Sequence, residues 1–212
     1  MLPRWLIKVA FHLLYHQLAF TYDAVAWLVS LGQWPAWRRL SLQFVGDGPI
    51  LELAYGTGGL FADMQRVGHR PVGIDLSPFM ARLASRRLRR LGLPLPLSRA
   101  RAQQLPFPAG HFGSVIATFP TPYIFEPETL AEVARVLRSE GRLIVVMEGH
   151  LLAPAPLRRL IDWLYQITAQ RDFSDAAPLR RFEQAGLTAE WRTVSLNGAS
   201  AKLLIAAKNS PR

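Results

Sequence analysis

Residues 49–61 read Pro49-Ile50-Leu51-Glu52-Leu53-Ala54-Tyr55-Gly56-Thr57-Gly58-Gly59-Leu60-Phe61. Apolar residues at 50, 51 and 53 predict a buried strand with an acid near its end, and three glycines then lead into a helical pattern through Leu60, Phe61 and Met64. Because glycine has no Cβ, such a turn lets a ligand approach the backbone, and the helix that follows offers unpaired N–H groups. The motif therefore predicts a nucleotide-type ligand at the carboxyl end of the strand, with a plain tight turn as the alternative.

A second acid supports the ligand site. The short apolar run at 72–76 predicts another strand, and its acid, Asp75, follows Gly56 by 19 positions. Doubly wound folds place a carboxylate here to accept hydrogen bonds from a ribose diol. A dinucleotide fingerprint needs a third glycine at position 61, where this chain has Phe61. The pattern therefore argues against a dinucleotide.

These residues resemble the class I S-adenosylmethionine-dependent methyltransferases, in particular the small-molecule and quinone methyltransferases. The first motif of that family is an acid followed by three glycines at alternating positions, and here it reads Glu52, Ala54, Gly56, Gly58. The resemblance continues through Asp75, 103–107 and 114–118, and is strong over about residues 48–148. It implies an α/β fold with a Rossmann-like, doubly wound, mostly parallel seven-stranded sheet, and S-adenosyl-L-methionine as cofactor with S-adenosyl-L-homocysteine as product.

The resemblance also implies which residues bind the cofactor. Glu52 and the Gly56–Gly58 turn are expected to hold its methionine end, Asp75 its ribose, and Ala102 with Gln103 its adenine. The full set expected from the motifs is Tyr22, Glu52, Ala54, Tyr55, Gly56, Gly58, Asp75, Leu76, Met80, Ala102, Gln103 and Thr118.

A candidate catalytic residue follows the predicted fourth strand, 112–118. The strand is followed by Phe119-Pro120-Thr121-Pro122-Tyr123, at the place where the family has the floor of the methyl-transfer site. Two prolines stiffen this segment and are expected to present Thr118 and Tyr123 near the reacting centre. Tyr123 is the candidate acid–base residue, and because a tyrosine pKa is about 10 in water, packing against substrate or cofactor is an alternative role.

The remaining pattern alternates helices and strands, as a doubly wound sheet requires. Helices are predicted from the glycine turn to Gly68, from Ser77-Pro78 to Gly92, and from Glu126 to Leu137, with strands at 95–101 and 143–147. A final helix at 179–185 precedes a C-terminal antiparallel hairpin, 191–196 with 202–207, joined by Asn197-Gly198.

The helix that begins at Ser77 carries the most basic stretch of the chain. Its inward stripe is expected to be Met80, Leu83, Ala84, Leu88 and Leu91, and its arginines at 82, 86, 87, 89 and 90 are expected to point away from the sheet. Such a face is usually solvated.

The chain is predicted to form a single methyltransferase domain, because its 212 residues, half of them hydrophobic, suit one core. We divide it into an N-terminal helical lid, 1–47, a cofactor-binding core, 48–148, a substrate-side insertion, 149–178, and the final helix with the terminal hairpin, 179–212. The aromatic segment 2–31 has only 14 uncharged residues between Lys8 and Asp23, too few to span a bilayer. It is expected to be a mobile lid or a membrane-facing helix, or else to pack on the sheet.

Composition excludes several chemistries. The absence of cysteine excludes disulfides, thiolate metal sites and a cysteine nucleophile, and His12 with His16 lack a third ligand nearby, so we expect no metal. The formal charge of +10 would attract nucleic acid or anionic lipid, although it can also reflect base composition. The chain has no appended nucleic-acid module, so we expect a cytoplasmic protein with peripheral contact to an anionic membrane rather than to nucleic acid.

The predicted function is S-adenosylmethionine-dependent methyl transfer to a small, apolar acceptor by direct displacement. The sulfonium already makes the methyl group electrophilic, so the protein mainly aligns the nucleophile and excludes water. One alternative is a nicotinamide-dependent oxidoreductase, which Phe61 and the hairpin oppose. Another is a catalytically silent cofactor-binding module, favoured by Ala54 and by Arg101 in the place of the family's acid. An RNA methyltransferase is the third. The pattern specifies neither the acceptor atom nor an oligomeric state.

Overall fold

The structure, a computed structural model, describes residues 23, 26, 27, 30–151, 177–196 and 199–209. Several predicted features lie outside these ranges. They are Tyr22, the pair His12 and His16, the Asn197-Gly198 turn, and most of the segments 2–31 and 149–178.

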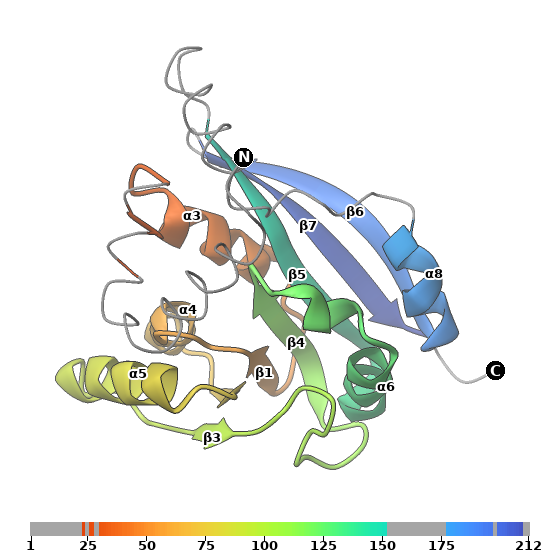
Figure 1. Ribbon diagram of the computed structural model, residues 1–212, viewed down its shortest axis with the longest axis horizontal. Coiled ribbons are helices and arrows are strands. Elements are labelled where there is room, and N and C mark those ends of the chain that lie inside the picture. The colour runs from red at the N-terminus through yellow and green to blue at the C-terminus, as the bar shows by residue number, and fades with distance from the viewer. Residues whose placement is uncertain (1–22, 24–25, 28–29, 152–176, 197–198, 210–212) are drawn as a thin grey trace, which may run out of the picture.

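Within the described ranges the strands form one seven-stranded sheet in the order β3-β2-β1-β4-β5-β7-β6. Strands β1 to β5 pair in parallel, and β7 pairs antiparallel with both β5 and β6 (Figure 1). The predicted doubly wound sheet with a C-terminal antiparallel hairpin is therefore confirmed. The strands are β1 Ile50–Leu53, β2 Pro71–Asp75, β3 Leu97–Arg99, β4 Phe112–Thr118, β5 Leu137–Leu151, β6 Leu187–Leu196 and β7 Ala199–Lys208.

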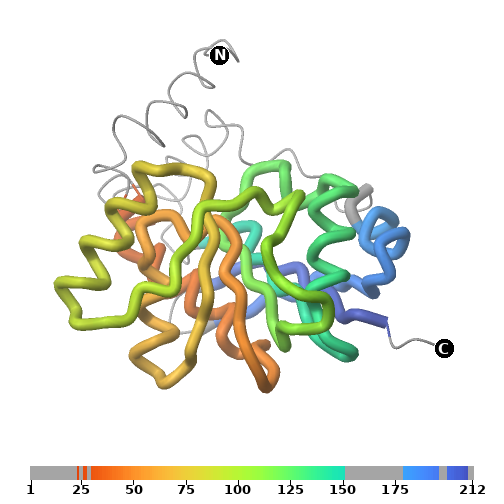
Figure 2. Tube along the Cα trace, turned by 90° about the horizontal axis from the view of Figure 1, so that it is seen from below, coloured from red at the N-terminus to blue at the C-terminus, as the bar shows by residue number. Residues whose placement is uncertain are grey.

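Helices cover both faces of this sheet. On one face α6 and α8 pack against the strands through Val133 and Phe182, and on the other α3, α4 and α5 pack through Trp37, Phe61 and Leu88, all five fully buried. Helix α5 and strand β3 lie at one edge of the molecule and the hairpin with α8 at the other (Figure 2). The helices are α3 Trp34–Arg39, η2 Leu40–Phe44, α4 Gly59–Arg66, α5 Pro78–Arg90, η3 Pro122–Phe125, α6 Pro127–Val136 and α8 Ala177–Gln184.

Four strands differ in length from the prediction, since β6 and β7 each have ten residues in place of six. Strand β3 has three residues in place of seven, because Pro94 and Pro96 have no N–H to donate to a neighbouring strand. Strand β5 runs from the end of α6 to Leu151 because its ends pair with other strands: Leu137 with Phe112 in β4, and residues 148–151 with β7. The two ends of β5 contain polar residues, so a pattern based on hydrophobicity does not predict them as strand.

Helix α5 begins as predicted, since the Ser77 side chain accepts a hydrogen bond from the Met80 N–H at 3.3 Å and Pro78 is the first helical residue. Its buried stripe is Met80, Ala84 and Leu88. The prediction for Leu91 is wrong: this residue follows the helix end and is 41% exposed.

Part of the predicted lid, 1–47, is core. Helix α3 and the 3-10 turn η2 place Trp37 and Leu40 in the cluster that packs against β5 and β7, and both side chains are buried. The Trp34 N–H donates to the Ser30 hydroxyl at 3.0 Å at the start of α3. The segment 34–44 is therefore a correction to the predicted boundary of the lid, because its apolar side chains fill the space beside the sheet.

Candidate functional site

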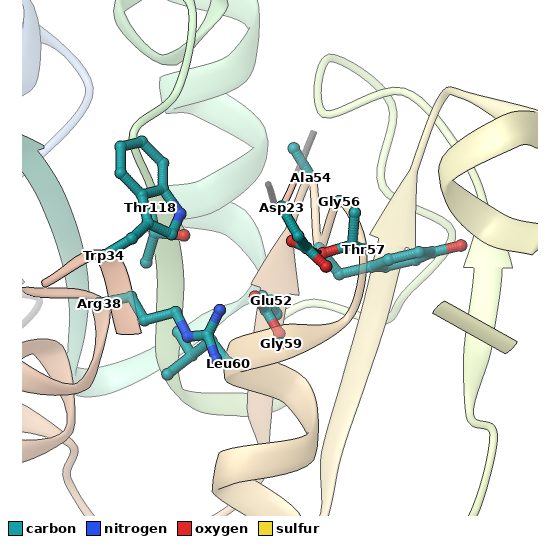
Figure 3. Close-up of a pocket in the computed structure, with 11 residues that line it drawn as sticks. Asp23, Trp34, Arg38, Glu52, Ala54, Gly56, Thr57, Gly59, Leu60 and Thr118 are labelled. Atoms are coloured by element: carbon teal, nitrogen blue, oxygen red, sulfur yellow. Dashed lines mark hydrogen bonds between the residues drawn. The ribbon is translucent and has the colours of Figure 1, made fainter. Parts of the chain in front are cut away.

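A pocket opens where β1 and β4 end (Figure 3). Five of the predicted cofactor-binding residues line it, namely Glu52, Ala54, Tyr55, Gly56 and Thr118. The other lining residues are Asp23, Trp34, Arg38, Thr57, Gly59 and Leu60. In Figure 3 Glu52 lies between Trp34 with Thr118 on one side and Asp23 with Thr57 on the other.

The glycine turn between β1 and α4 has an unusual backbone. Ala54, Gly56 and Gly58 have φ angles of 51°, 55° and 73°. The left-handed region costs a residue with a Cβ about 1–3 kcal/mol, which is a physical reason for the family's glycine at the position of Ala54. The turn keeps this conformation although the first glycine is replaced by alanine.

Asp75 holds this turn from the neighbouring strand. Its Oδ2 accepts a hydrogen bond from the Gly56 N–H at 2.9 Å, and its Oδ1 accepts one from the Ser77 N–H at 2.8 Å. The residue is only 7% exposed, and burial raises the pKa of its carboxyl despite these backbone hydrogen bonds. Asp75 therefore has a structural role in the turn beside any contact with a ribose.

Glu52 is the most perturbed acid in the pocket. The residue is 2% exposed, and burial raises the pKa of its carboxyl to about 8, although the nearby Arg38 guanidinium lowers it. Its Oε2 is buried and finds no hydrogen-bond partner among the described residues. A buried acceptor without a partner is costly unless a ligand supplies the donor.

Arg38 lies on the same side of the pocket as the start of α4. Its Nη2 donates to Asp63 Oδ2 at 3.1 Å, and Arg39 Nε donates to the same oxygen at 2.9 Å. A Cβ built on Gly59 would lie 2.1 Å from Arg38 Nη1, so only glycine lets the guanidinium cover this helix start. The pocket thus combines one buried carboxyl, from Glu52, with one guanidinium.

The other predicted cofactor contacts that the structure describes do not line the pocket. Leu76 follows Asp75 and is 51% exposed, Met80 is buried in the core face of α5, and Gly58 packs against that helix. Ala102 is buried in the loop after β3.

The loop after β3 is tied to helix α6. Gln103 Nε2 donates to Glu126 Oε2 at 2.6 Å, and the Leu105 N–H donates to Glu132 Oε2 at 2.6 Å. Arg135 completes the attachment by donating to the Leu105 carbonyl at 2.9 Å and to Glu132, and its hydrogen bond is the main reason why the pKa of the Glu132 carboxyl is lowered. The predicted adenine-binding loop therefore has a fixed position.

Tyr123, the predicted catalytic residue, lies in η3 and packs against the core face that α6 covers. Its hydroxyl oxygen is buried, and the residue is not among those that line the described pocket. Phe119, four residues earlier, has a φ of 49° and stacks on Trp34 with 3.9 Å between ring centroids. The structure thus brings Thr118 to the pocket but not Tyr123, whose catalytic role stays a prediction.

Comparison with known proteins places this geometry in a family. A methyltransferase domain family matches residues 50–141. A demethylmenaquinone methyltransferase from Thermus thermophilus is 32% identical over 164 residues, which cover 74% of this chain and 72% of that protein. The chain belongs to the class I S-adenosylmethionine-dependent methyltransferases.

A second relative is the ubiquinone/menaquinone biosynthesis C-methyltransferase of Psychromonas ingrahamii, 30% identical over 158 residues that cover 70% of this chain and 62% of that protein. The chain thus spans less than two thirds of that relative. Among solved structures, the YcgJ protein from Bacillus subtilis has a TM-score of 0.64 at 15% identity, covering 83% of this chain and 99% of that one. Geranyl diphosphate C-methyltransferase from Streptomyces coelicolor has a TM-score of 0.61 at 19% identity, covering 82% and 77%. Both structures share the fold of this methyltransferase.

S-adenosylmethionine is the cofactor of this family, and the pocket of this methyltransferase fits the group. The unpartnered Oε2 of Glu52 can accept a hydrogen bond from an ammonium group, and the Arg38 guanidinium can donate to a carboxylate. Sequence reasoning missed Arg38 and Trp34 as lining residues, because long-range packing brings α3 to the turn. It also left out Thr57, which lies between the predicted residues Gly56 and Gly58. The glycine at position 59 was the available signal, since it permits the close approach of Arg38.

Gly58 offers a direct test of the tight turn in this methyltransferase. A Cβ on Gly58, where φ is 73°, would lie 2.9 Å from the Ala84 Cβ, so we expect Gly58→Ala to lower the free energy of unfolding by about 2–4 kcal/mol. The matched control is Gly68→Ala, because φ there is 91° but no atom of the described residues lies within 4 Å of a Cβ. Urea denaturation should show a clearly smaller loss for Gly68→Ala; equal losses would mean that the contact with α5 is unimportant.

Proposed function

We propose that this protein transfers a methyl group from S-adenosylmethionine to a small, apolar, flat acceptor of the quinone type. The observation that supports this proposal is the composition of the pocket, where two ionisable groups, Glu52 and Arg38, lie beside an aromatic wall that begins at Trp34. The ionisable side suits the amino-acid end of the cofactor, and the aromatic side suits an apolar acceptor.

In this proposal, residues of the chain are assigned to each part of the cofactor. Glu52 binds the ammonium group, Arg38 the carboxylate, the Gly56–Gly58 turn approaches the methionine end, and Asp75 accepts from the ribose diol. Ala102 and Gln103 meet the adenine. Bound S-adenosylmethionine supplies an electrophilic methyl group, so the chain's own task is to bind, orient and exclude water.

The acceptor class follows from the aromatic wall and from the relatives. Trp34 stacks on Phe119 at 3.9 Å with 26° between the rings, and the edge of Trp37 meets Trp34 at 6.3 Å. Thr118, at the end of β4, lines the same pocket. Such a wall favours a flat apolar ring. The relatives named for demethylmenaquinone and for ubiquinone or menaquinone biosynthesis point to the same chemistry.

The test is a transfer assay with methyl-labelled S-adenosylmethionine. A demethylated quinol with a short isoprenoid tail, geranyl diphosphate and total RNA are offered in parallel to the purified full-length protein. We expect label in the quinol. Label in RNA would favour an RNA methyltransferase, and cofactor binding with no transfer to any acceptor would favour a silent binding module.

We also propose that the protein reaches this substrate at an anionic membrane surface. Its support is the row of exposed arginines on α5, Arg82, Arg86, Arg89 and Arg90. In the part of the chain that the structure describes, no helix has the length and apolar character needed to cross a membrane. We expect the protein to sediment with vesicles that contain anionic lipid at low salt, and to be released at high salt. Equal sedimentation with neutral vesicles, or none with either, would contradict this contact.

A further inference from the structure

Asp23 lies at the pocket beside the glycine turn (Figure 3). Its Oδ1 accepts a hydrogen bond from the Thr57 hydroxyl at 2.8 Å, and its Oδ2 accepts one from Arg87 Nη2. Thr57 belongs to the turn after β1 and Arg87 to helix α5, so the three residues come from three separate parts of the sequence. The Asp23 carboxylate therefore contacts two elements of the cofactor site, the turn after β1 and helix α5.

Arg87 closes this arrangement from the other side. Its Nη1 donates to the Thr57 carbonyl at 3.0 Å and lies 3.0 Å from the Thr57 hydroxyl oxygen, while Nη2 pairs with Asp23. The planar guanidinium can make these contacts together, which a lysine ammonium cannot do in the same geometry. The expectation that Arg87 points away from the sheet with its neighbours is therefore wrong, because the side chain bends back to the turn.

The cluster of Asp23, Thr57 and Arg87 holds the middle of the turn, between two positions that other described residues hold. Gly56, before Thr57, is bonded to Asp75, and Gly58, after it, packs on Ala84. Thr57 itself is 7% exposed, and its side chain and carbonyl oxygen are both bonded to the cluster. The turn is thus restrained from β2 on one side and from α5 on the other.

We infer that Asp23 and Arg87 are positioning residues: their bonds to Thr57 hold the glycine turn ready for the cofactor, so that cofactor binding is coupled to the Asp23–Arg87 pair. The inference rests on the proposed function, since it concerns the same cofactor site. A turn that is already ordered loses less conformational freedom when a ligand binds, so the cluster raises affinity by ordering the turn before the cofactor arrives. Coupling is reciprocal, so bound cofactor also strengthens the Asp23–Arg87 pair.

Four variants of the full-length chain test this coupling by calorimetric titration with S-adenosylhomocysteine. They are Arg87→Gln, Asp23→Asn, the double variant, and Arg86→Gln as control. Arg86 is exposed on the same helix, and its replacement removes the same charge without reaching the turn. We expect Arg87→Gln and Asp23→Asn each to bind about tenfold more weakly, the effect of losing one charge-assisted hydrogen bond. The double variant should be no weaker than the poorer single variant, and Arg86→Gln should bind as the wild type does.

Two further measurements distinguish a positioning role of Asp23 and Arg87 from a general effect on the stability of the fold. The thermal unfolding midpoint of all four variants without ligand should stay close to that of the wild type, because the side chains of Asp23 and Arg87 are 42% and 32% exposed. The affinity gap between wild type and Arg87→Gln should narrow at high salt. If Arg87→Gln binds as tightly as Arg86→Gln, or if the two single effects simply add, the coupling is refuted. If Arg87→Gln does not fold, Asp23→Asn alone decides. Failure of the wild type to bind would instead refute the proposed function.

Discussion

Replacing Glu52 by glutamine should stabilise the protein without cofactor at pH 8 and, in the same variant, greatly weaken cofactor binding. Burial holds the pKa of the Glu52 carboxyl at about 8, well above its ordinary value of 4.5. At pH values between 4.5 and about 8, the Glu52 carboxyl is mostly protonated in the folded protein and mostly ionised in the unfolded chain. The folded protein therefore binds more protons at this site. The free energy of unfolding therefore falls as pH rises from 4.5 to 8, by an amount on the order of 5 kcal/mol.

Glutamine cannot ionise, so Glu52→Gln should remove this slope from the plot of unfolding free energy against pH. The matched control is Glu128→Gln, which changes an exposed glutamate in the first turn of α6. Urea denaturation at several pH values measures both variants. A slope that survives in Glu52→Gln would show that the Glu52 carboxyl ionises without a penalty and would contradict the raised pKa.

The same substitution tests the ammonium contact. An ammonium beside Glu52 favours the carboxylate and lowers its pKa, so binding at pH 7 should release a proton from the wild type. Calorimetric titrations with S-adenosylhomocysteine in two buffers of different ionisation enthalpy detect this release. We expect Glu52→Gln to lose both the release and about a hundredfold in affinity, because a charge-assisted bond worth up to about 3 kcal/mol is removed. Unchanged affinity would assign Glu52 a purely structural role.

Asp75→Ala should lose both stability and cofactor binding. The sequence alone predicts only a contact between Asp75 and the ribose, and loss of that contact would lower cofactor affinity more than stability. The structure buries Asp75 and bonds it to the N–H groups of Gly56 and Ser77. Without the carboxyl these two donors lose their acceptor, which should lower the free energy of unfolding by about 2–4 kcal/mol.

The effect of Asp75→Ala on affinity should exceed about a hundredfold, because the variant loses the ribose contact and also releases Gly56 from its place in the turn. Asp47→Ala, at an exposed position before β1, is the control for loss of one acid. Denaturation of both variants measures the free energy of unfolding, and calorimetry measures the affinity for the cofactor. An Asp75→Ala protein as stable as the control would mean that backbone bonds to Asp75 do not hold the turn.

Local motifs explain what the sequence could predict. The strand, glycine turn and helix around Gly56, the two acids Glu52 and Asp75, and strand β4 at 112–118 all depend on residues close in sequence. Their hydrophobic pattern and backbone requirements can therefore be read without knowing the rest of the fold. These parts of the prediction are confirmed as structure.

Contacts between distant segments explain what the sequence could not predict. Arg38 reaches the pocket only because Trp37 anchors α3 in the core, and nothing in the local pattern of α3 identifies a site. Arg87 looks like its neighbours in an arginine-rich helix, and only the arrival of Asp23 and Thr57 distinguishes it. The ends of β5 depend in the same way on pairing with β4 and β7.

The central claim is that this pocket binds S-adenosylmethionine and its demethylated product in preference to a dinucleotide. Calorimetric titration of the purified full-length protein with S-adenosylhomocysteine and, separately, with NAD measures this preference. We predict saturable binding of S-adenosylhomocysteine and much weaker or undetectable binding of NAD. Binding of NAD together with no binding of S-adenosylhomocysteine would contradict the account.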